Sequence, residues 1–111
     1  MEIKLLHLGG VAVLCMKGSL TTEHTADLKK NLEDLLTADH VRIVMDLKGV
    51  DYIDTHGLAI LINRKIDFQK RKGDIHLAGL NETIQRIFLE TSLENYFRIF
   101  SSVEEACKSF S

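Results

Sequence analysis

One short stretch, residues 46–58, gathers several side chains that could do chemistry. It holds three carboxylates, one hydroxyl, one imidazole and two glycines, directly before a predicted helix: Asp46-Leu47-Lys48-Gly49-Val50-Asp51-Tyr52-Ile53-Asp54-Thr55-His56-Gly57-Leu58. Thr55 is expected at or just before the helix start, where the first backbone N–H groups lack helical partners and carry partial positive charge. Such a place can hold a phosphate group. The stretch therefore predicts either a phosphate-accepting hydroxyl at Thr55 or an ordinary helix N-cap.

The neighbours of Thr55 each have more than one possible role. Asp54 could cap the helix or orient the Thr55 hydroxyl for phosphotransfer, and the residue types do not separate these roles. His56 could be a pH-sensitive contact or a phosphohistidine, although most surface histidines have no special role. Gly57 lets the backbone turn or approach a partner closely. Asp46 ends a strand, where a carboxylate is more often structural than catalytic.

Other chemistry finds little support. No glycine-rich phosphate cradle and no nucleophile–base pair is present, so an enzyme using Asp46, Asp54 and His56 to hydrolyse a nucleotide is the least favoured alternative. No cofactor is expected. The other histidines lack the spacing of metal ligands, which argues against a metal site: His7, His24, His40 and His76. Cys15 and Cys107 form no redox or metal motif, and we expect them to be buried and inert.

Composition places the chain among soluble globular proteins. It has 111 residues, the size of one domain spanning 1–111, with 45% hydrophobic and 27% charged residues. The net charge of −2 gives no basic excess for nucleic acid or for an anionic membrane. No apolar run is long enough for a membrane span and no signal peptide is recognisable, so we expect a cytoplasmic protein. The balanced surface charge suggests a monomer.

Hydrophobic periodicity predicts the order β-β-α-β-α-β-α-β-α. Strands alternating with helices imply an α/β fold, with a mixed, mostly parallel five-stranded sheet that opens with an antiparallel hairpin and carries four helices. The strands are expected at Ile3–Leu8, Val11–Lys17, Val41–Met45, Ile75–Ala78 and Phe97–Phe100. Gly9-Gly10 suits a two-residue hairpin turn, and residues 48–57 are expected to form a loop.

Capping residues and apolar spacing locate the helices. The first carries leucines at positions 28, 32, 35 and 36 and could be capped by Thr21 or Thr22. The second runs roughly over residues 58–71 and stops at Gly73. Asn81 is the expected cap of the third. Ser102 with Glu105 resembles a capping box before the fourth.

The second helix suggests a contact surface next to Thr55. Its apolar residues gather on one side: Leu58, Leu61, Ile62, Ile66 and Phe68. Ile60 points the other way, among polar residues that include Arg64. A single exposed apolar residue is ordinary, but its position beside Thr55 makes Ile60 a candidate partner contact, to which Arg64 could add a charge.

Residues 46–58 resemble the signature of the STAS domain family, the anti-sigma-factor antagonists. In that family a strand ends in Asp-Leu, and an aromatic or apolar pair then precedes Asp-Ser-(Ser/Thr/Ala)-Gly-Leu at a helix start. The matching residues here are Asp46-Leu47 and the run from Tyr52 to Leu58. The resemblance extends over nearly the whole chain, including Gly18 after the hairpin, the break at Gly73 and the terminal helix.

The resemblance implies a phosphorylation switch. In phosphorylated family members the hydroxyl residue after the aspartate, here Thr55, accepts phosphate from a serine/threonine kinase that is also the anti-sigma factor. Unphosphorylated antagonist binds the kinase and frees the sigma factor. Phosphorylated antagonist is released, and a phosphatase resets it. A second possibility within the family is a scaffold or accessory subunit of a transporter or signalling assembly, in which Thr55 is never phosphorylated.

Three positions depart from the family pattern. Thr55 replaces the favoured serine, and a kinase could discriminate against its extra methyl group. His56 stands where a small residue is usual. Thr21 stands where an acidic residue is frequent, three positions after Gly18. These differences bear on the identity of the partner more than on the fold.

Overall fold

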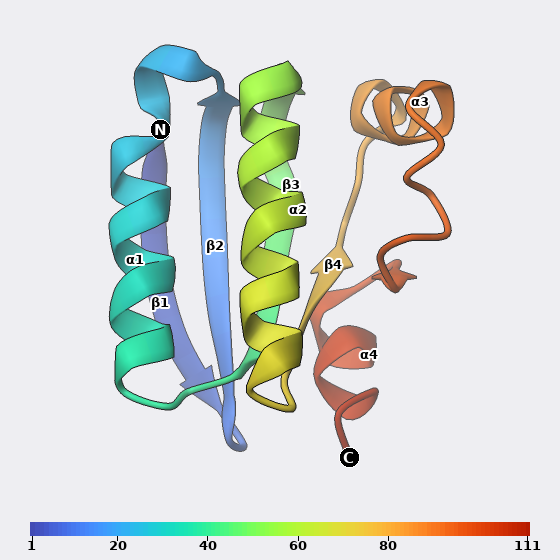
Figure 1. The fold of residues 1–111 in the computed structure, drawn as a ribbon. Coiled ribbons are helices and arrows are strands. Elements are labelled where there is room, and N and C mark those ends of the chain that lie inside the picture. Colours follow the sequence, from blue (N-terminus) through green and yellow to red (C-terminus); the bar gives the residue numbers. More distant parts are fainter.

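The computed structural model describes residues 1–111 and shows one five-stranded sheet with four α-helices (Figure 1). The strand order is β1-β2-β3-β4-β5, in which β1 pairs antiparallel with β2 and all other pairs are parallel. The predicted sheet type and element order are confirmed, with one added 3₁₀ turn, η1. The bounds are β1 Glu2–Leu8, β2 Val11–Leu20, η1 Thr22–His24, α1 Ala26–Thr37, β3 Arg42–Ile53, α2 Thr55–Lys70, β4 Asp74–Ala78, α3 Glu82–Glu90, β5 Ile99–Phe100 and α4 Val103–Lys108.

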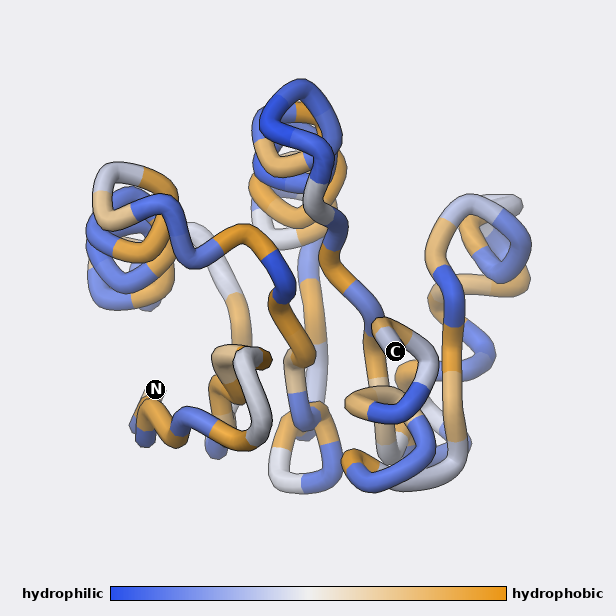
Figure 2. Tube along the Cα trace, turned by 90° about the horizontal axis from the view of Figure 1, so that it is seen from below, coloured by the Kyte–Doolittle hydropathy of each residue, from blue (hydrophilic) through white to orange (hydrophobic).

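The helices cover the two faces of the sheet unequally. α1, α2 and α3 pack on one face over a core of 21 buried residues, and α4 packs on the other over a cluster of five (Figure 2). Strand β2 contributes to both, since Leu14 belongs to the larger cluster and Val13 to the smaller one. None of the helices combines the length and the apolar character that crossing a bilayer would require.

The third strand is much longer than its sequence pattern predicts. It was expected to end near Asp46 with a loop over residues 48–57, but β3 continues to Ile53. Strand β2 also continues, to Leu20, and the two stay paired, with register shifts between Cys15 and Lys17 and between Gly18 and Ser19. These shifts bury residues at a spacing of three, Leu47, Val50 and Ile53, in place of the two-residue alternation of a regular strand.

Several local predictions about turns and caps are confirmed. Gly9 and Gly10 both have positive φ, 56° and 82°, as a tight hairpin turn requires. The Asn81 side chain accepts a hydrogen bond from the N–H of Ile84 at the start of α3. Ser102 accepts from the N–H of Glu105 and donates to its carboxylate, a capping contact at the start of α4.

Three further predicted boundaries are wrong. Neither Thr21 nor Thr22 caps α1, which begins after η1 with Thr25 in the cap position. Helix α2 begins at Thr55, three residues earlier than expected, because Asp54 provides the cap. Strand β5 begins at Ile99, and Phe97 is a buried core residue in the preceding loop.

A buried polar cluster joins α2, β4 and α4. Lys65 is only 3% exposed, and its ammonium group forms an ion pair with Asp74. The other carboxylate oxygen of Asp74 lies 3.5 Å from Nε2 of His76, whose Nδ1 lies 2.6 Å from the Ser109 hydroxyl. The His76 ring also stacks on Phe110. Because each polar group has a partner, the cluster holds two helices to β4 without leaving an unpaired charge.

Candidate functional site

Thr55 lies at the edge of the sheet where the parallel strands β2 and β3 end, at the top of α2 in Figure 1. It is the first residue of α2, and it is exposed. In open α/β sheets this edge is the usual place for ligands and partners. The predicted position at the helix start is therefore confirmed.

Asp54 is the cap of α2, the first of its two possible roles. Its Oδ1 accepts a hydrogen bond from the N–H of Gly57 at 2.8 Å. Its Oδ2 accepts from the N–H and the hydroxyl of Thr22 at 2.9 and 3.2 Å. The bonds from Gly57 and then Thr22 hold the pKa of Asp54 below its usual value. None of its hydrogen bonds goes to Thr55, so Asp54 positions the helix start and ties it to the loop before α1.

The helix start retains backbone donors next to Thr55. The N–H of Gly57 is taken by Asp54, and that of Leu58 by the Asp54 carbonyl. The first two N–H groups of the helix, those of Thr55 and His56, donate neither to the Asp54 side chain nor to a backbone carbonyl. They are the unpaired donors expected at a helix N-terminus, where an anion is stabilised.

Gly57 brings α2 close to the end of β2. A Cβ atom at this position would lie 2.6 Å from the carbonyl oxygen of Leu20 and 2.9 Å from its Cγ. Any larger residue would push the start of α2 away from β2. Gly57 thus allows a close backbone approach, as predicted, but the segment that it approaches is the end of β2 and not a partner protein.

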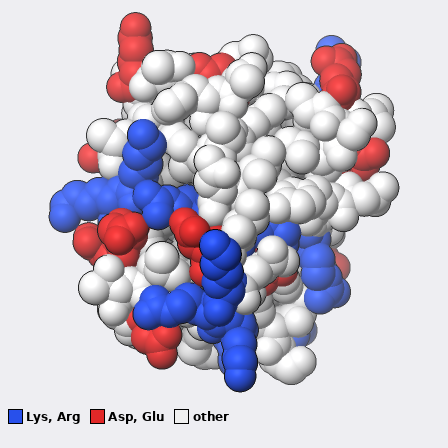
Figure 3. Space-filling model, viewed as in Figure 1, with Lys and Arg blue, Asp and Glu red and all other residues white.

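A groove between α1 and α2 leads away from the helix start. Its volume is about 390 Å³, and its lining combines residues of both helices: Lys29, His56, Ala59, Ile60, Asn63, Arg64 and Asp67. The lining includes three candidate residues predicted from the sequence, His56 and the pair Ile60 and Arg64. In Figure 3 the middle of the molecule's upper half, around the first turns of α2, carries few charged side chains, whereas Lys, Arg, Asp and Glu gather lower down.

The expected exposure of Ile60 is wrong. Ile60 is 7% exposed and belongs to the main core, whereas Ile66, expected on the inner face, is 38% exposed. The buried residues of α2 include Leu61, Lys65 and Phe68 together with Ile60. Ile60 can therefore contribute only a small part of the groove wall.

Arg64 is held between the two helices. Its Nη1 donates to Oε2 of Glu33 on α1 at 3.0 Å and lies 3.4 Å from Oδ2 of Asp67. The side chain is one-quarter exposed. Sequence reasoning missed Glu33 because nothing in the local pattern links it to a residue 31 positions away. Arg64 is thus already paired in the free protein.

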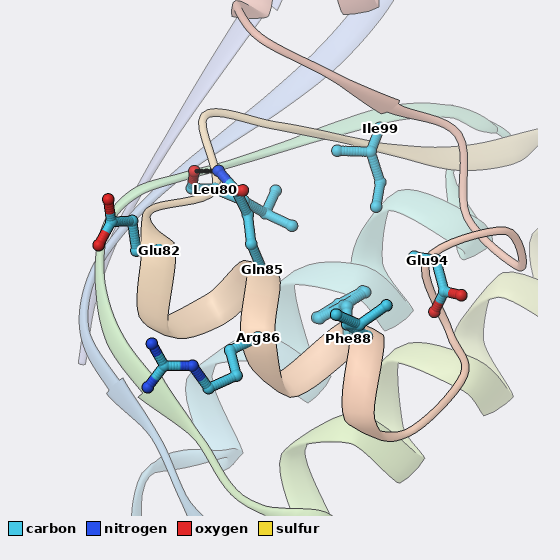
Figure 4. Close-up of a pocket in the computed structure, with 8 residues that line it drawn as sticks. Leu80, Glu82, Gln85, Arg86, Phe88, Glu94 and Ile99 are labelled. Carbon is cyan, nitrogen blue, oxygen red and sulfur yellow. Dashed lines mark hydrogen bonds between the residues drawn. The ribbon is translucent and has the colours of Figure 1, made fainter.

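A second and larger cavity lies beside α3. Its volume is about 520 Å³ and its lining mixes apolar and charged side chains: Leu80, Glu82, Gln85, Arg86, Phe88, Leu89, Glu94 and Ile99 (Figure 4). It shares no residue with the α1–α2 groove.

The two cysteines are far apart in the chain and half-buried, and burial raises the pKa of the Cys107 thiol. These features make Thr55 and its groove the better candidate site.

Comparison with known proteins gives consistent relatives. The chain is 22% identical over 110 residues to BtrV of Bordetella bronchiseptica, named a "putative anti-sigma factor antagonist", covering 99% of this chain and 95% of BtrV. The crystal structure of a Thermotoga maritima protein with the same description superposes with a TM-score of 0.90 at 23% identity, over 96% of this chain and 92% of that one. The phosphorylated form of the Bacillus cell fate determinant SpoIIAA superposes with a TM-score of 0.77 at 14% identity, over 99% and 100%.

The family assignment rests on more than these pairwise likenesses. The structural similarities are below 25% identity and by themselves establish the shared fold. The STAS domain, however, matches residues 2–106, nearly the whole chain. The chain therefore belongs to the STAS domain family.

Proposed function

We propose that this protein is an anti-sigma-factor antagonist whose binding to an anti-sigma-factor serine/threonine kinase is controlled by phosphorylation of Thr55. The observation that carries the proposal is the exposed residue Thr55 on the first turn of α2, beside two backbone N–H groups without helical partners. The names of its relatives support the same class of regulator. In this proposal residues 1–111 act as one cytoplasmic STAS domain without a cofactor, and a phosphatase restores the unphosphorylated form.

A phosphate on Thr55 would be tolerated by the fold. It adds about −1.5 to −2 charges at neutral pH, next to the positive end of the α2 dipole. The half-buried Asp54 carboxylate opposes it, but that carboxylate is occupied by three hydrogen bonds from Gly57 and Thr22. The attraction and the repulsion partly cancel, so phosphorylation changes the surface more than the stability of the domain.

The partner would therefore sense the phosphate directly. The α1–α2 groove begins at His56, one residue from Thr55, and Arg64 within it is already paired with Glu33. A kinase seated over the first turns of α2 meets a surface with few charges, where a new dianion must be desolvated on binding. Release on phosphorylation follows from that cost and from the added bulk.

The direct test is phosphotransfer. The protein is incubated with ATP and the anti-sigma-factor kinase encoded nearest to its gene, and the modified residue is mapped by mass spectrometry. Phosphate is expected on Thr55; Thr55→Val should abolish it, Thr55→Ser should retain it, and the neighbouring Thr22→Ala should leave it intact. Phosphate at another residue, or none with a kinase active on its other substrates, refutes the proposal.

The binding consequence is measured by titrating the kinase with two variants. Thr55→Glu is expected to weaken binding about tenfold or more, whereas Thr55→Ala should bind like the parent. Equal binding by both variants would favour the scaffold or accessory role, in which Thr55 has no switching function.

A further inference from the structure

Strand β1 leaves one edge of the sheet open along its full length. It pairs with β2 from Glu2 to Leu8 in continuous register, without a bulge, and has no strand on its other side. The opposite edge of the sheet, β5, has only two residues. Open edges are normally protected by prolines, bulges, short length or charged side chains, and of these features β1 has only two charged residues, Glu2 at its start and Lys4 near its middle. The row of unpaired backbone donors and acceptors is therefore available to another strand.

The side chains of β1 are unusually apolar for an exposed edge. Leu5, Leu6 and Leu8 are 38%, 37% and 47% exposed. Leu6 and Leu8 lie opposite Val13 and Val11, which belong to the core cluster under α4. Leu5 lies opposite Leu14, on the face covered by α1 and α2. The apolar surface thus continues from both core clusters to the open edge.

We propose that β1 is the site at which a second copy of this chain binds, with the two β1 strands antiparallel and the two sheets joined into one. Along a strand, the backbone N–H and C=O groups of successive residues point alternately to one side and to the other. In an antiparallel pair, two opposed residues must either both direct these groups at each other or both direct them away. Two copies of β1 can therefore pair only in every second register. The full-length register places Leu5 opposite Leu5 of the second copy. It also opposes Ile3 to His7, Lys4 to Leu6 and Glu2 to Leu8.

Charge and length select this register over its neighbours. It opposes no two like charges directly, and Leu6 of each copy lies diagonally across from Leu6 of the other, within side-chain reach. The next allowed register in one direction places Lys4 opposite Lys4 of the second copy. Slipping in the other direction loses the pairs made by Glu2 and Ile3. The edge is therefore self-complementary, which favours a second copy of the chain and a closed two-fold dimer.

The dimer is expected to be reversible. Two short strands bury less surface than a standard interface, below about 1,200 Å². The Lys4 side chains of the two copies also lie diagonally across from each other, and their like charges weaken the pairing. The expectation of a monomer was based on the balanced net charge of the chain. Pairing of two β1 strands depends instead on backbone hydrogen bonds and on contacts between leucine side chains, so the net charge does not exclude it. The β1 edge lies away from the α2 start (Figure 1), so dimer formation leaves Thr55 accessible.

Disulfide trapping tests the register. In a chain with Cys15→Ser and Cys107→Ser, Leu5→Cys should form a covalent dimer under mild oxidation, because opposed residues in a ladder have Cα atoms about 4.5–5.5 Å apart. Leu89→Cys is the matched control, since Leu89 on α3 is 64% exposed and apolar, and it should stay monomeric. Glu2→Cys mixed with Leu8→Cys should give a mixed dimer. Trapping of Leu5→Cys no faster than Leu89→Cys overturns the proposal.

Sedimentation equilibrium tests association of the unmodified chain. The parent should show a concentration-dependent dimer, and Leu5→Lys should be monomeric, because two lysines would then face each other across the two-fold axis. Leu89→Lys should dimerise like the parent, and circular dichroism should show all three proteins folded. A parent that remains monomeric up to about millimolar concentration, or a Leu5→Lys dimer as stable as that of the parent, contradicts the proposal.

Discussion

Thr55 and Asp54 are neighbours in the chain with different roles. Asp54 uses both carboxylate oxygens to hold the start of α2 and the η1 segment together. Thr55 makes no such contact and stays exposed. The division matters because a modification at Thr55 leaves the hydrogen bonds that define the helix start intact. His56, which fits the family pattern least, faces the groove and could make the partner contact specific to this protein.

Replacing Asp54 with alanine should lower thermal stability at neutral pH. The variant loses the cap of α2 and the tie to Thr22, and the midpoint should fall by roughly a few degrees. Because its pKa is lower in the folded protein, Asp54 stabilises the fold above its unfolded-state pKa, and this contribution disappears as pH falls through the folded-state value. Thermal unfolding of both proteins from pH 7 to pH 2.5 should therefore show the gap closing below about pH 4.

The control for this prediction is Asp51→Ala. Asp51 lies close in sequence and is exposed, and it makes no hydrogen bond or ion pair through its side chain. Its removal should leave the midpoint nearly unchanged. A gap for Asp54→Ala that persists unchanged at pH 2.5 would show that the carboxylate charge does not contribute.

At the scale of elements, Asp74 connects helices on the two faces of the sheet. It binds Lys65 from α2 and faces His76, which contacts Ser109 at the end of α4. Burial raises the pKa of Asp74, but hydrogen bonds from His76 and Lys65 outweigh it, so the pKa lies below its usual value. Lys65 also lies over the rings of Tyr96 and Phe97, 5.6 and 5.4 Å from their centroids. Helix positions therefore depend on one charged group at the start of β4.

Asp74→Asn should be strongly destabilising because it leaves the Lys65 ammonium group buried without a counter-charge. Breaking a buried ion pair by removing one partner costs about 3–5 kcal/mol, so the free energy of unfolding measured in urea should fall by about 3 kcal/mol. Lys65→Met with Asp74→Asn should recover most of this loss, since the buried charge is then absent. Equal instability of the single and double variants would locate the effect elsewhere, in the contact with His76.

At the scale of the whole molecule, the two proposed interaction surfaces lie on different parts of the fold. The Thr55 surface lies at the end of α2, whereas the β1 edge lies on the flank of the sheet (Figure 1). α1 separates the α1–α2 groove from that flank. The protein could therefore bind a kinase and a second copy of itself at the same time, which would present two phosphorylation sites in one assembly.

The two surfaces should respond independently to substitution. Thr55→Glu should leave the dissociation constant of the dimer unchanged within about twofold, and Leu5→Lys should leave the rate of phosphorylation unchanged within the same limit, because the sites share no residue. Sedimentation equilibrium and a phosphorylation time course measure the two effects. A change of about tenfold in the dimer dissociation constant of Thr55→Glu, or in the phosphorylation rate of Leu5→Lys, would reveal coupling between the two surfaces.

The sequence by itself determined the order of the elements, the hairpin turn, the caps at Asn81 and Ser102, and the place of Thr55 at a helix start. These features depend on residues within one or two turns of each other, whose local preferences agree with the final fold. Packing between distant segments set the length of β3, which follows its pairing with β2, and the burial of Ile60 in the main core. It also decided the pairing of Lys65 with Asp74.

The residues around Thr55 show the same division. Its place at the helix start follows from the local pattern, but the bonds from Thr22 to the second carboxylate oxygen of Asp54 form only because folding brings together residues 32 positions apart. The side-chain contacts that fix the site span long separations in the chain, and a pattern of spacing carries no information about which distant groups will meet. The position of Thr55 at the helix start was therefore predictable, whereas the groove and the hydrogen-bond network around it were not.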